Sequence, residues 1–169
     1  TLGTVYFDRL FPMGVDAMME SLDLVKAGVK LRHKQQLDDG SYESWFKKDL
    51  AELDFTKPVA DVYNVIRAAN PAPDILISRI SPAAAPGAWA VIKGTKLDIY
   101  DAAKVAGGAG APGTITAIDG DGITIAANGG SILAKRVKAP DGKKIAATEW
   151  AGSAGLRVGD RFDAPATKS

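Results

Sequence analysis

The sequence contains no cysteine and a single histidine, His33. Without cysteine the chain has no disulfide, no thiolate nucleophile and no thiolate ligand for zinc, and one histidine cannot form a histidine cluster around a metal. We therefore expect no metal site. His33 lies between Arg32 and Lys34 in a polar stretch, where a solvated side chain is a simpler interpretation than an anion-binding or titrating site.

Long hydrophobic runs and an excess of either charge are also absent. The net charge of +1 says nothing about partners, and no run of about 18 apolar residues is present to span a membrane. The first residues lack the basic-then-apolar order of a secretory signal, and the chain does not start with methionine. We expect a cytoplasmic chain without a membrane partner, and we expect it to be part of a larger protein.

Among the features that are present, the first is an amphipathic segment. Over residues 12–27 the apolar side chains recur at helical spacing, and Gly28 suits the C-terminal cap. Met13, Met18 and Met19 belong to the apolar side of this predicted helix. Because methionine fills irregular apolar gaps, we interpret the three as core packing.

A second helix is predicted between Thr56 and Asn70. Thr56 is expected to accept a hydrogen bond from a first-turn amide, and Pro58 to lie in the first turn, where its missing N–H costs little. Asn70 followed by Pro71 ends the helix. Its apolar face consists of Val59, Val62, Tyr63, Ile66 and Ala69.

Residues 29–55 are polar and charged, which is typical of a linker. Tyr42, Trp45 and Phe46 interrupt this stretch at near-helical spacing. We expect a short helical turn over residues 41–49 that anchors the linker on a neighbouring surface.

After the second helix the apolar period changes to that of strands. Five short segments rich in Ile, Val, Thr and aromatic residues alternate with turn pairs such as Asp119-Gly120 and Asn128-Gly129. They predict a mostly β fold with flanking helices, built as a small antiparallel open barrel of the oligomer-binding type. A short helix over residues 146–154 and a last edge strand at 159–162 follow, and 104–112 is a flexible connection. The five segments are residues 88–91, 97–100, 113–118, 122–126 and 132–137.

The order of several motifs resembles the folate-dependent formyltransferases and 10-formyltetrahydrofolate hydrolases. Leu10-Phe11-Pro12-Met13-Gly14, Pro86-Gly87-Ala88-Trp89 and Asp141-Gly142-Lys143-Lys144 carry the resemblance, the first and last being most like the hydrolase branch. The resemblance implies C-terminal helices of a catalytic domain at residues 1–28, a linker at 29–55, a formyltransferase C-terminal barrel at 56–163 and a disordered tail at 164–169. Residues 74–85 lie between the second helix and the first strand as an insertion relative to the family pattern.

The resemblance also implies a role in one-carbon metabolism, and it implies which domain carries out the chemistry. In the family, a catalytic Asn, His and Asp occupy an N-terminal Rossmann-like domain, and none of the three is matched in this chain. We therefore expect no catalytic and no cofactor-binding residue here. The parent enzyme would use 10-formyltetrahydrofolate as co-substrate and transfer its formyl group to an amine, such as methionyl-tRNA, or to water. The partner of this chain would be the absent catalytic domain.

One cluster of cations is a candidate nucleic-acid site, because the barrel helps to hold tRNA in the tRNA-acting branch of the family. The alternative interpretation is a solvated hairpin without a ligand, because Trp150 is the only aromatic residue close to the cluster in sequence. A rival to the enzyme hypothesis is a stand-alone barrel that binds RNA or a protein without any reaction. The candidate residues are Lys135, Arg136, Lys138, Lys143 and Lys144.

Overall fold

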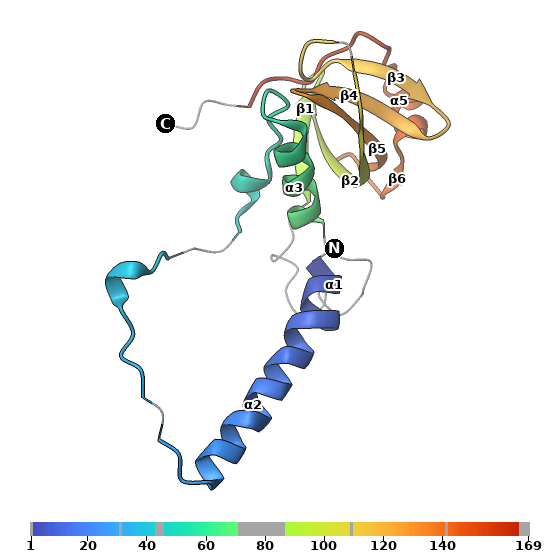
Figure 1. Cartoon of the computed structure of the whole chain (residues 1–169). Helices are drawn as coiled ribbons and strands as arrows, with labels where there is room; N and C mark the ends of the chain where they lie inside the picture. The colour runs from blue at the N-terminus through green and yellow to red at the C-terminus, as the bar shows by residue number, and fades with distance from the viewer. Residues whose placement is uncertain are drawn as a thin grey trace.

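The computed structural model describes residues 2–30, 32–42, 46–70, 87–108, 110–140 and 142–165. The predicted insertion at 74–85 and most of the predicted disordered tail lie outside the described residues, as does Trp45. Figure 1 shows a compact barrel at the top of the view, and a long N-terminal helix that lies apart from it.

The barrel is built from one antiparallel sheet. Its strands follow the order β1-β2-β5-β4-β3, and the short strand β6 pairs with β5. This arrangement confirms the predicted fold class. Each of the five predicted strand segments is present, and β2 is longer than expected, so that it includes the first two residues of the predicted flexible connection. The strands are β1 (Ala88–Ile92), β2 (Thr95–Val105), β3 (Ile115–Asp119), β4 (Gly122–Ala127), β5 (Gly130–Lys138) and β6 (Ile145–Ala146).

A segment near the C-terminus, residues 157–163, closes the gap between the two outer strands, and we call it the C-terminal strap. The Asp163 amide donates to the Val91 carbonyl of β1 at 2.8 Å, and the Phe162 amide donates to the Gly113 carbonyl before β3 at 2.9 Å. The edge strand predicted at 159–162 is therefore wrong, because the strap forms isolated bridges instead of a strand: Phe162 pairs with Ile92 of β1, and Arg161 pairs with Thr114 just before β3. It satisfies backbone groups that an open edge would expose.

Branched side chains from the strands fill the barrel. Ile99, Ile115 and Val137 have no exposed surface, and Phe162 of the strap packs on Phe55 with ring centroids 5.3 Å apart. Residues 51–55 fall within the predicted linker, yet Ala51, Leu53 and Phe55 are buried in this core. The end of that segment is thus part of the barrel's packing.

Two helices pack against the sheet: α3 (Val59–Ala69) and α5 (Ala147–Ser153). The predicted cap of α3 is wrong, because Pro58 occupies the cap position and no side chain caps the helix. The Thr56 hydroxyl instead donates to Asp54 Oδ1 at 2.5 Å, and the Thr56 amide donates to the same oxygen at 3.0 Å. Asp54 thus forms a turn with its own backbone two residues further on, a pattern that aspartate favours before a helix.

The N-terminal helical segment is continuous from α1 (Leu2–Val5) through the π-helical turn Tyr6–Leu10 into α2 (Phe11–Lys26). Gly28 follows the cap residue with φ +76°, as the sequence predicts. The predicted core packing of the methionines does not occur within the described chain: Met13, Met18 and Met19 are 65%, 62% and 53% exposed. No other described element covers this helix, so its apolar side faces solvent.

Between α2 and the barrel the chain forms two short 3₁₀ turns, Leu37–Asp39 and Lys48–Ala51. The helical turn predicted over residues 41–49 is wrong in its position, because Tyr42 is 88% exposed outside any helix. Of the aromatic anchors expected in this segment, Phe46 packs against the core.

Candidate functional site: a basic and aromatic face of the barrel

The outer side of β1 carries an aromatic side chain fixed by the segment that precedes the barrel. Trp89 Nε1 donates to the Lys48 carbonyl at 2.7 Å, and the Leu53 amide donates to the Trp89 carbonyl at 2.8 Å. The two bonds hold the 3₁₀ turn Lys48–Ala51 and the residues after it against β1. They bring the Lys48 side chain to the face of the sheet.

Lys96 of β2 meets this aromatic ring. Its Nζ lies 3.7 Å from the Trp89 ring centroid, a cation–π contact, and it interacts with the Lys48 side chain. Burial and the nearby Lys48 charge lower the pKa of the Lys96 ammonium, while Asp98 and Glu52 oppose that shift. Two lysines therefore converge beside an indole ring.

Asp98 lies at the centre of this arrangement. The strand register places it opposite Trp89 on one side and opposite Lys138 on the other. Burial raises the pKa of the Asp98 carboxyl, although Lys48, Lys96 and Lys138 all act to lower it. The carboxylate is half-buried and balances part of the positive charge around it.

A second aromatic ring continues the same face. Tyr100 of β2 lies opposite Arg136 of β5, and Lys144 Nζ lies 4.1 Å from the Tyr100 ring centroid. Arg136 Nη2 donates to the Lys144 carbonyl at 3.2 Å, which fixes the loop before β6. Gly87 has φ +78°, and a side chain there would approach the Tyr100 hydroxyl to 2.8 Å, so glycine is required.

These residues form one surface, which we call the basic face. It contains two aromatic rings between cations, with one carboxylate at its centre. The cations of this arrangement can bind phosphate groups, whereas the rings are partly covered: Tyr100 is only 8% exposed, and Lys96 lies over the Trp89 ring. Its members are Lys48, Trp89, Lys96, Asp98, Tyr100, Arg136, Lys138 and Lys144.

The structure separates the five cations singled out in the sequence. Arg136, Lys138 and Lys144 belong to the basic face, whereas Lys135 is exposed but lies out of alternation with Arg136 and Lys138, and Lys143 is exposed in the loop before β6. Lys48 and Lys96 were missed, because they lie far from the cluster in sequence. The predicted strand 97–100 began one residue after Lys96; with the strand extended to Lys96, its alternation with Asp98 and Tyr100 was the available signal.

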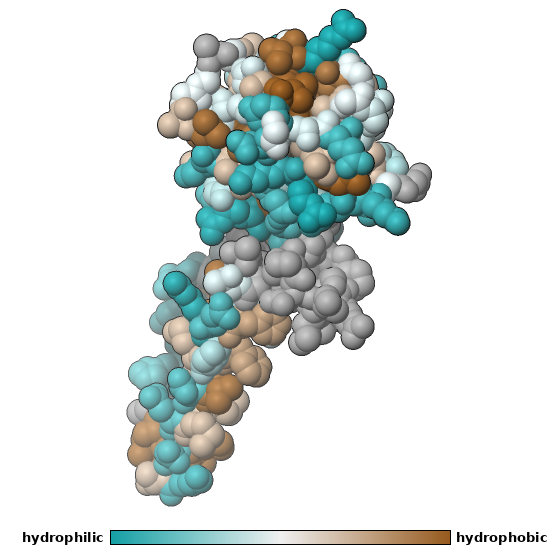
Figure 2. Space-filling model, turned by 90° about the vertical axis from the view of Figure 1, so that its right-hand side faces the viewer, coloured by the Kyte–Doolittle hydropathy of each residue, from teal (hydrophilic) through white to brown (hydrophobic). Residues whose placement is uncertain are grey.

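A different kind of surface lies on the N-terminal helix. Figure 2 shows hydrophobic side chains exposed along it, below the barrel. Seven residues of the π-helical turn and α2 line a shallow apolar hollow, which we call the helix hollow: Tyr6, Leu10, Phe11, Gly14, Val15, Met18 and Met19. An apolar side this long on a single helix is typical of a docking surface.

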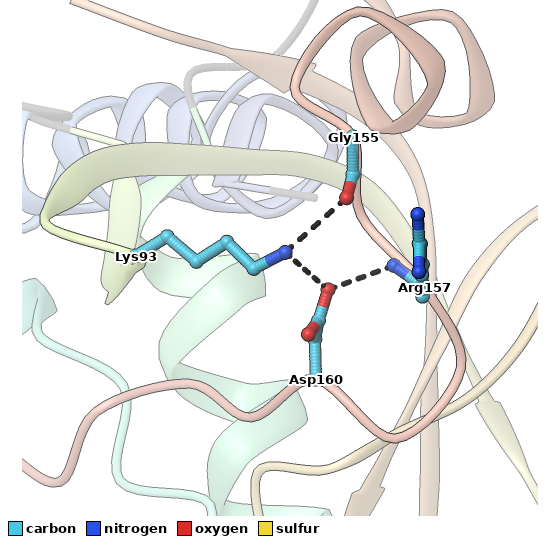
Figure 3. Close-up of polar contacts among 4 residues, drawn as sticks. All are labelled: Lys93, Gly155, Arg157 and Asp160. Atoms are coloured by element: carbon cyan, nitrogen blue, oxygen red, sulfur yellow. Dashed lines mark hydrogen bonds and ion pairs between the residues drawn. The ribbon is translucent and has the colours of Figure 1, made fainter.

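The polar contacts in Figure 3 serve the fold. Lys93, at the tip of the β1–β2 hairpin, pairs with Asp160 of the C-terminal strap at 2.7 Å and donates to the Gly155 carbonyl at 3.2 Å. The Arg157 amide donates to Asp160 Oδ2 at 2.8 Å. The Lys93 hydrogen bond, aided by that amide, lowers the pKa of the Asp160 carboxyl. The contacts hold the strap against the hairpin.

The described part of the chain holds no group of three or more His, Cys, Asp or Glu residues arranged to bind a metal ion. Within the same residues, no helix combines the length and the apolar character needed to cross a membrane.

The fold itself defines a small antiparallel barrel with flanking helices, and solved proteins share it. HypX from Aquifex aeolicus matches with a TM-score of 0.59 and 16% identity over 84% of this chain and 24% of that one. A HypX structure in complex with tetrahydrofolic acid matches with a TM-score of 0.58 over 91% of this chain and 26% of the other.

Sequence comparison gives the family. Residues 77–155 match the family "Formyl transferase, C-terminal domain". A methionyl-tRNA formyltransferase from Ectopseudomonas mendocina is 32% identical over 82% of this chain and 40% of its own length. A cytosolic 10-formyltetrahydrofolate dehydrogenase from Xenopus tropicalis is 28% identical over 95% of this chain and 18% of its own length. Residues 77–155 thus match the C-terminal domain of the formyltransferase family, and the chain spans less than half the length of these relatives.

Proposed function

We propose that the chain is the accessory C-terminal part of a 10-formyltetrahydrofolate-dependent formyltransferase or hydrolase. The relatives are formyltransferases and a formyltetrahydrofolate dehydrogenase, which supports membership in a formyl-transfer enzyme family. The chain's one histidine, His33, lies exposed in the segment between α2 and the barrel. No residue of this sequence matches the catalytic Asn, His and Asp that the family resemblance implies, so in this proposal catalysis would belong to another domain of the enzyme.

The uncovered apolar side of α2 carries this proposal. Met18 and Phe11 are 62% and 59% exposed in this chain, and exposure of many large apolar side chains on one helix is unfavourable. The helix hollow would pack against the catalytic domain, while residues of the 3₁₀ turn Lys48–Ala51 fix the other end of the connecting segment on β1. The chain would then attach the barrel to the enzyme in a defined position.

The test uses this chain and the longer protein in parallel. Each is incubated with 10-formyltetrahydrofolate, with and without charged initiator tRNA, and formyl release and formyl-methionyl-tRNA are measured. We expect no reaction with this chain alone and a reaction with the longer protein. Formyl release that ignores tRNA would identify the hydrolase, and formylated tRNA would identify the transferase. A longer protein inactive in both assays would contradict the proposal.

A second candidate function rests on the basic face: binding of tRNA or another RNA by the barrel. Lys96 and Trp89 lie in contact there, and Lys138, Arg136 and Lys144 continue the cationic surface around Tyr100. Phosphates would contact the cations, and the exposed part of the Trp89 ring would contact a base. The alternative is that the same residues form a solvated sheet surface that binds no RNA.

Titration of this chain with fluorescent tRNA at several salt concentrations distinguishes an RNA-binding face from a solvated sheet surface. We expect Lys138→Glu to weaken binding at least several-fold and to reduce the salt dependence, because one phosphate contact is lost. Asp98→Asn should strengthen binding, since it removes the carboxylate at the centre of the face. Lys30→Glu, at an exposed position remote from the face, is the matched control. Equal effects of the Lys138 and Lys30 variants would exclude the basic face as the RNA site.

A further inference from the structure

A cavity of about 290 Å³ lies where three segments that are distant in sequence come together. Residues 54–56 before α3, residues 112–113 before β3 and residues 161–165 all line it. We call it the strap cavity, because most of the third segment is the C-terminal strap. Small-molecule pockets begin at about 300 Å³, so the strap cavity suits a ligand of amino-acid size. It shares no residue with the basic face.

The positive charge in the strap cavity comes from Arg161. Its Nε donates to the Pro112 carbonyl at 3.0 Å. Gly113 has φ +86°, and a side chain there would approach the Phe162 carbonyl oxygen to 3.2 Å and Arg161 Cγ to 3.6 Å, so glycine allows the arginine stem to lie on this turn. Apart from Nε, the guanidinium makes no hydrogen bond or ion pair with another described residue. Both Nη groups can therefore bind a carboxylate as a fork.

Two carboxylates supply the opposite charge. Asp54 is half-buried, and its Oδ1 accepts from the Thr56 amide at 3.0 Å and from the Thr56 hydroxyl at 2.5 Å, which fixes the carboxylate and leaves Oδ2 for a ligand. Asp163 is exposed, and its amide donates to the Val91 carbonyl, so its backbone is held in place. Neither carboxylate forms an ion pair with Arg161 in the described part of the chain. Three charged groups thus line one cavity without pairing with one another.

We propose that the strap cavity is a binding site for a small cationic amino acid, the class of ligand that has one carboxylate and two cationic groups. The carboxylate binds the Nη groups of Arg161, and the two cationic groups bind Asp54 and Asp163. Two carboxylates and one guanidinium give the cavity a net charge of −1. This charge attracts a cationic amino acid and disfavours an acidic one. Pro112 and Pro165 also line the cavity and provide apolar surface for the aliphatic stem of the ligand.

Such a ligand would connect the strap to the rest of the barrel. Arg161 and Asp163 belong to the strap, whereas Asp54 precedes α3 and Pro112 precedes β3. A molecule that binds only the folded arrangement stabilises it by mass action, so the melting temperature of the chain should rise with the ligand concentration. Binding at this site is independent of the proposed formyl-transfer role and of RNA binding by the barrel.

Titration of the isotope-labelled chain with L-lysine, followed by NMR of the backbone amides, tests the proposal. L-Glutamate is titrated in parallel at the same pH and ionic strength. We expect L-lysine to cause saturable shifts at amides of the residues that line the strap cavity and to raise the melting temperature, and L-glutamate to do neither. Shifts that do not saturate, that lie outside the cavity, or that are equal for the two amino acids would overturn the proposal.

Asp163→Asn removes one charge from the cavity at an exposed position and leaves the backbone hydrogen bonds of the strap in place. We expect it to weaken L-lysine binding at least several-fold. Asp121→Asn is the matched control, because it makes the same change at an exposed position in the turn between β3 and β4, outside the cavity. Amide spectra without ligand check that both variants are folded. Equal affinity of the two variants for L-lysine would show that the strap cavity is not the binding site.

Discussion

The strands of the barrel and the N-terminal helix are both amphipathic, but the apolar side chains are buried in the barrel and exposed on the helix. In the barrel, Ile99 and Val137 have no exposed surface, while on the helix Met13 and Met18 are more than half exposed. The apolar spacing of a helix or strand determines which side seeks a partner, but it does not supply the partner. The barrel contains both halves of its packing. The apolar side of the helix is not covered by any other described part of the chain.

The largest expected effect comes from breaking the closure of the barrel with Phe162→Ala. Phe162 is 3% exposed, stacks on Phe55 and lies in the C-terminal strap that joins the outer strands. Removing its ring leaves a cavity, and the free energy of unfolding should fall by about 3–5 kcal/mol. Denaturant-induced unfolding of the chain measures this change.

Val158→Ala is the control within the same strap, because Val158 is 62% exposed. Its effect should stay within about 0.5 kcal/mol, the usual range for a surface position. Similar losses in both variants would show that the strap does not depend on core packing for its place.

An intermediate effect is expected for a substitution on the apolar side of α2, and only in the longer protein. In this chain, Met18→Gln should leave the free energy of unfolding within about 0.5 kcal/mol of the natural value, because the side chain is exposed. In the longer protein, where we propose that the helix hollow is covered, the same change should cost about 1.5–3 kcal/mol. The measurement is thermal or denaturant unfolding of both proteins.

Asp16→Asn is the matched change on the polar side of α2, at an exposed position, and it should have little effect in either protein. If Met18→Gln costs no more than Asp16→Asn in the longer protein, the helix hollow is not an interface with the catalytic domain.

The smallest effect concerns the ion pair that holds the strap. Hydrogen bonds from Lys93 and from the Arg157 amide lower the pKa of the Asp160 carboxyl. This carboxyl therefore binds a proton less readily in the folded state than in the unfolded chain. Its stabilisation is present above the ordinary aspartate pKa and is lost as the pH falls through the lowered value. Asp160→Asn should therefore slightly lower the melting temperature at neutral pH, with a difference that shrinks in acid. A pH-independent difference would assign the effect to the amide contacts instead.

The sequence predicted the parts of the fold whose causes are local. Turn pairs such as Asn128-Gly129 predicted the hairpins. Gly28 was predicted as the C-terminal cap of α2, and it lies one residue beyond the cap residue Ala27 with a positive φ. The cap of α3 was predicted wrongly, because Pro58 occupies the cap position and the Thr56 hydroxyl donates to Asp54 instead of accepting from a first-turn amide. The closing role of the strap was not predicted either, since it depends on hydrogen bonds between residues about 50 positions apart in sequence or further, such as Phe162 and Gly113.

The basic face shows the same division between local and distant causes. Arg136 and Lys138 are close in sequence and could be grouped from it. Lys48 and Lys96 join them only because the Trp89 indole holds the preceding segment on β1 and because β2 pairs with β5. Residues that meet through strand pairing show no mutual spacing in the sequence, so this half of the face became visible only in the structure.

Hydrogen exchange of this chain tests the central contrast most directly. We predict that amides in β2, β4 and β5 are protected up to the free energy of global unfolding, whereas amides in α2 exchange with little protection, and that α2 becomes protected in the longer protein. Protection of α2 in this chain equal to that of the barrel strands would contradict the account, because the helix would then be stable without a partner.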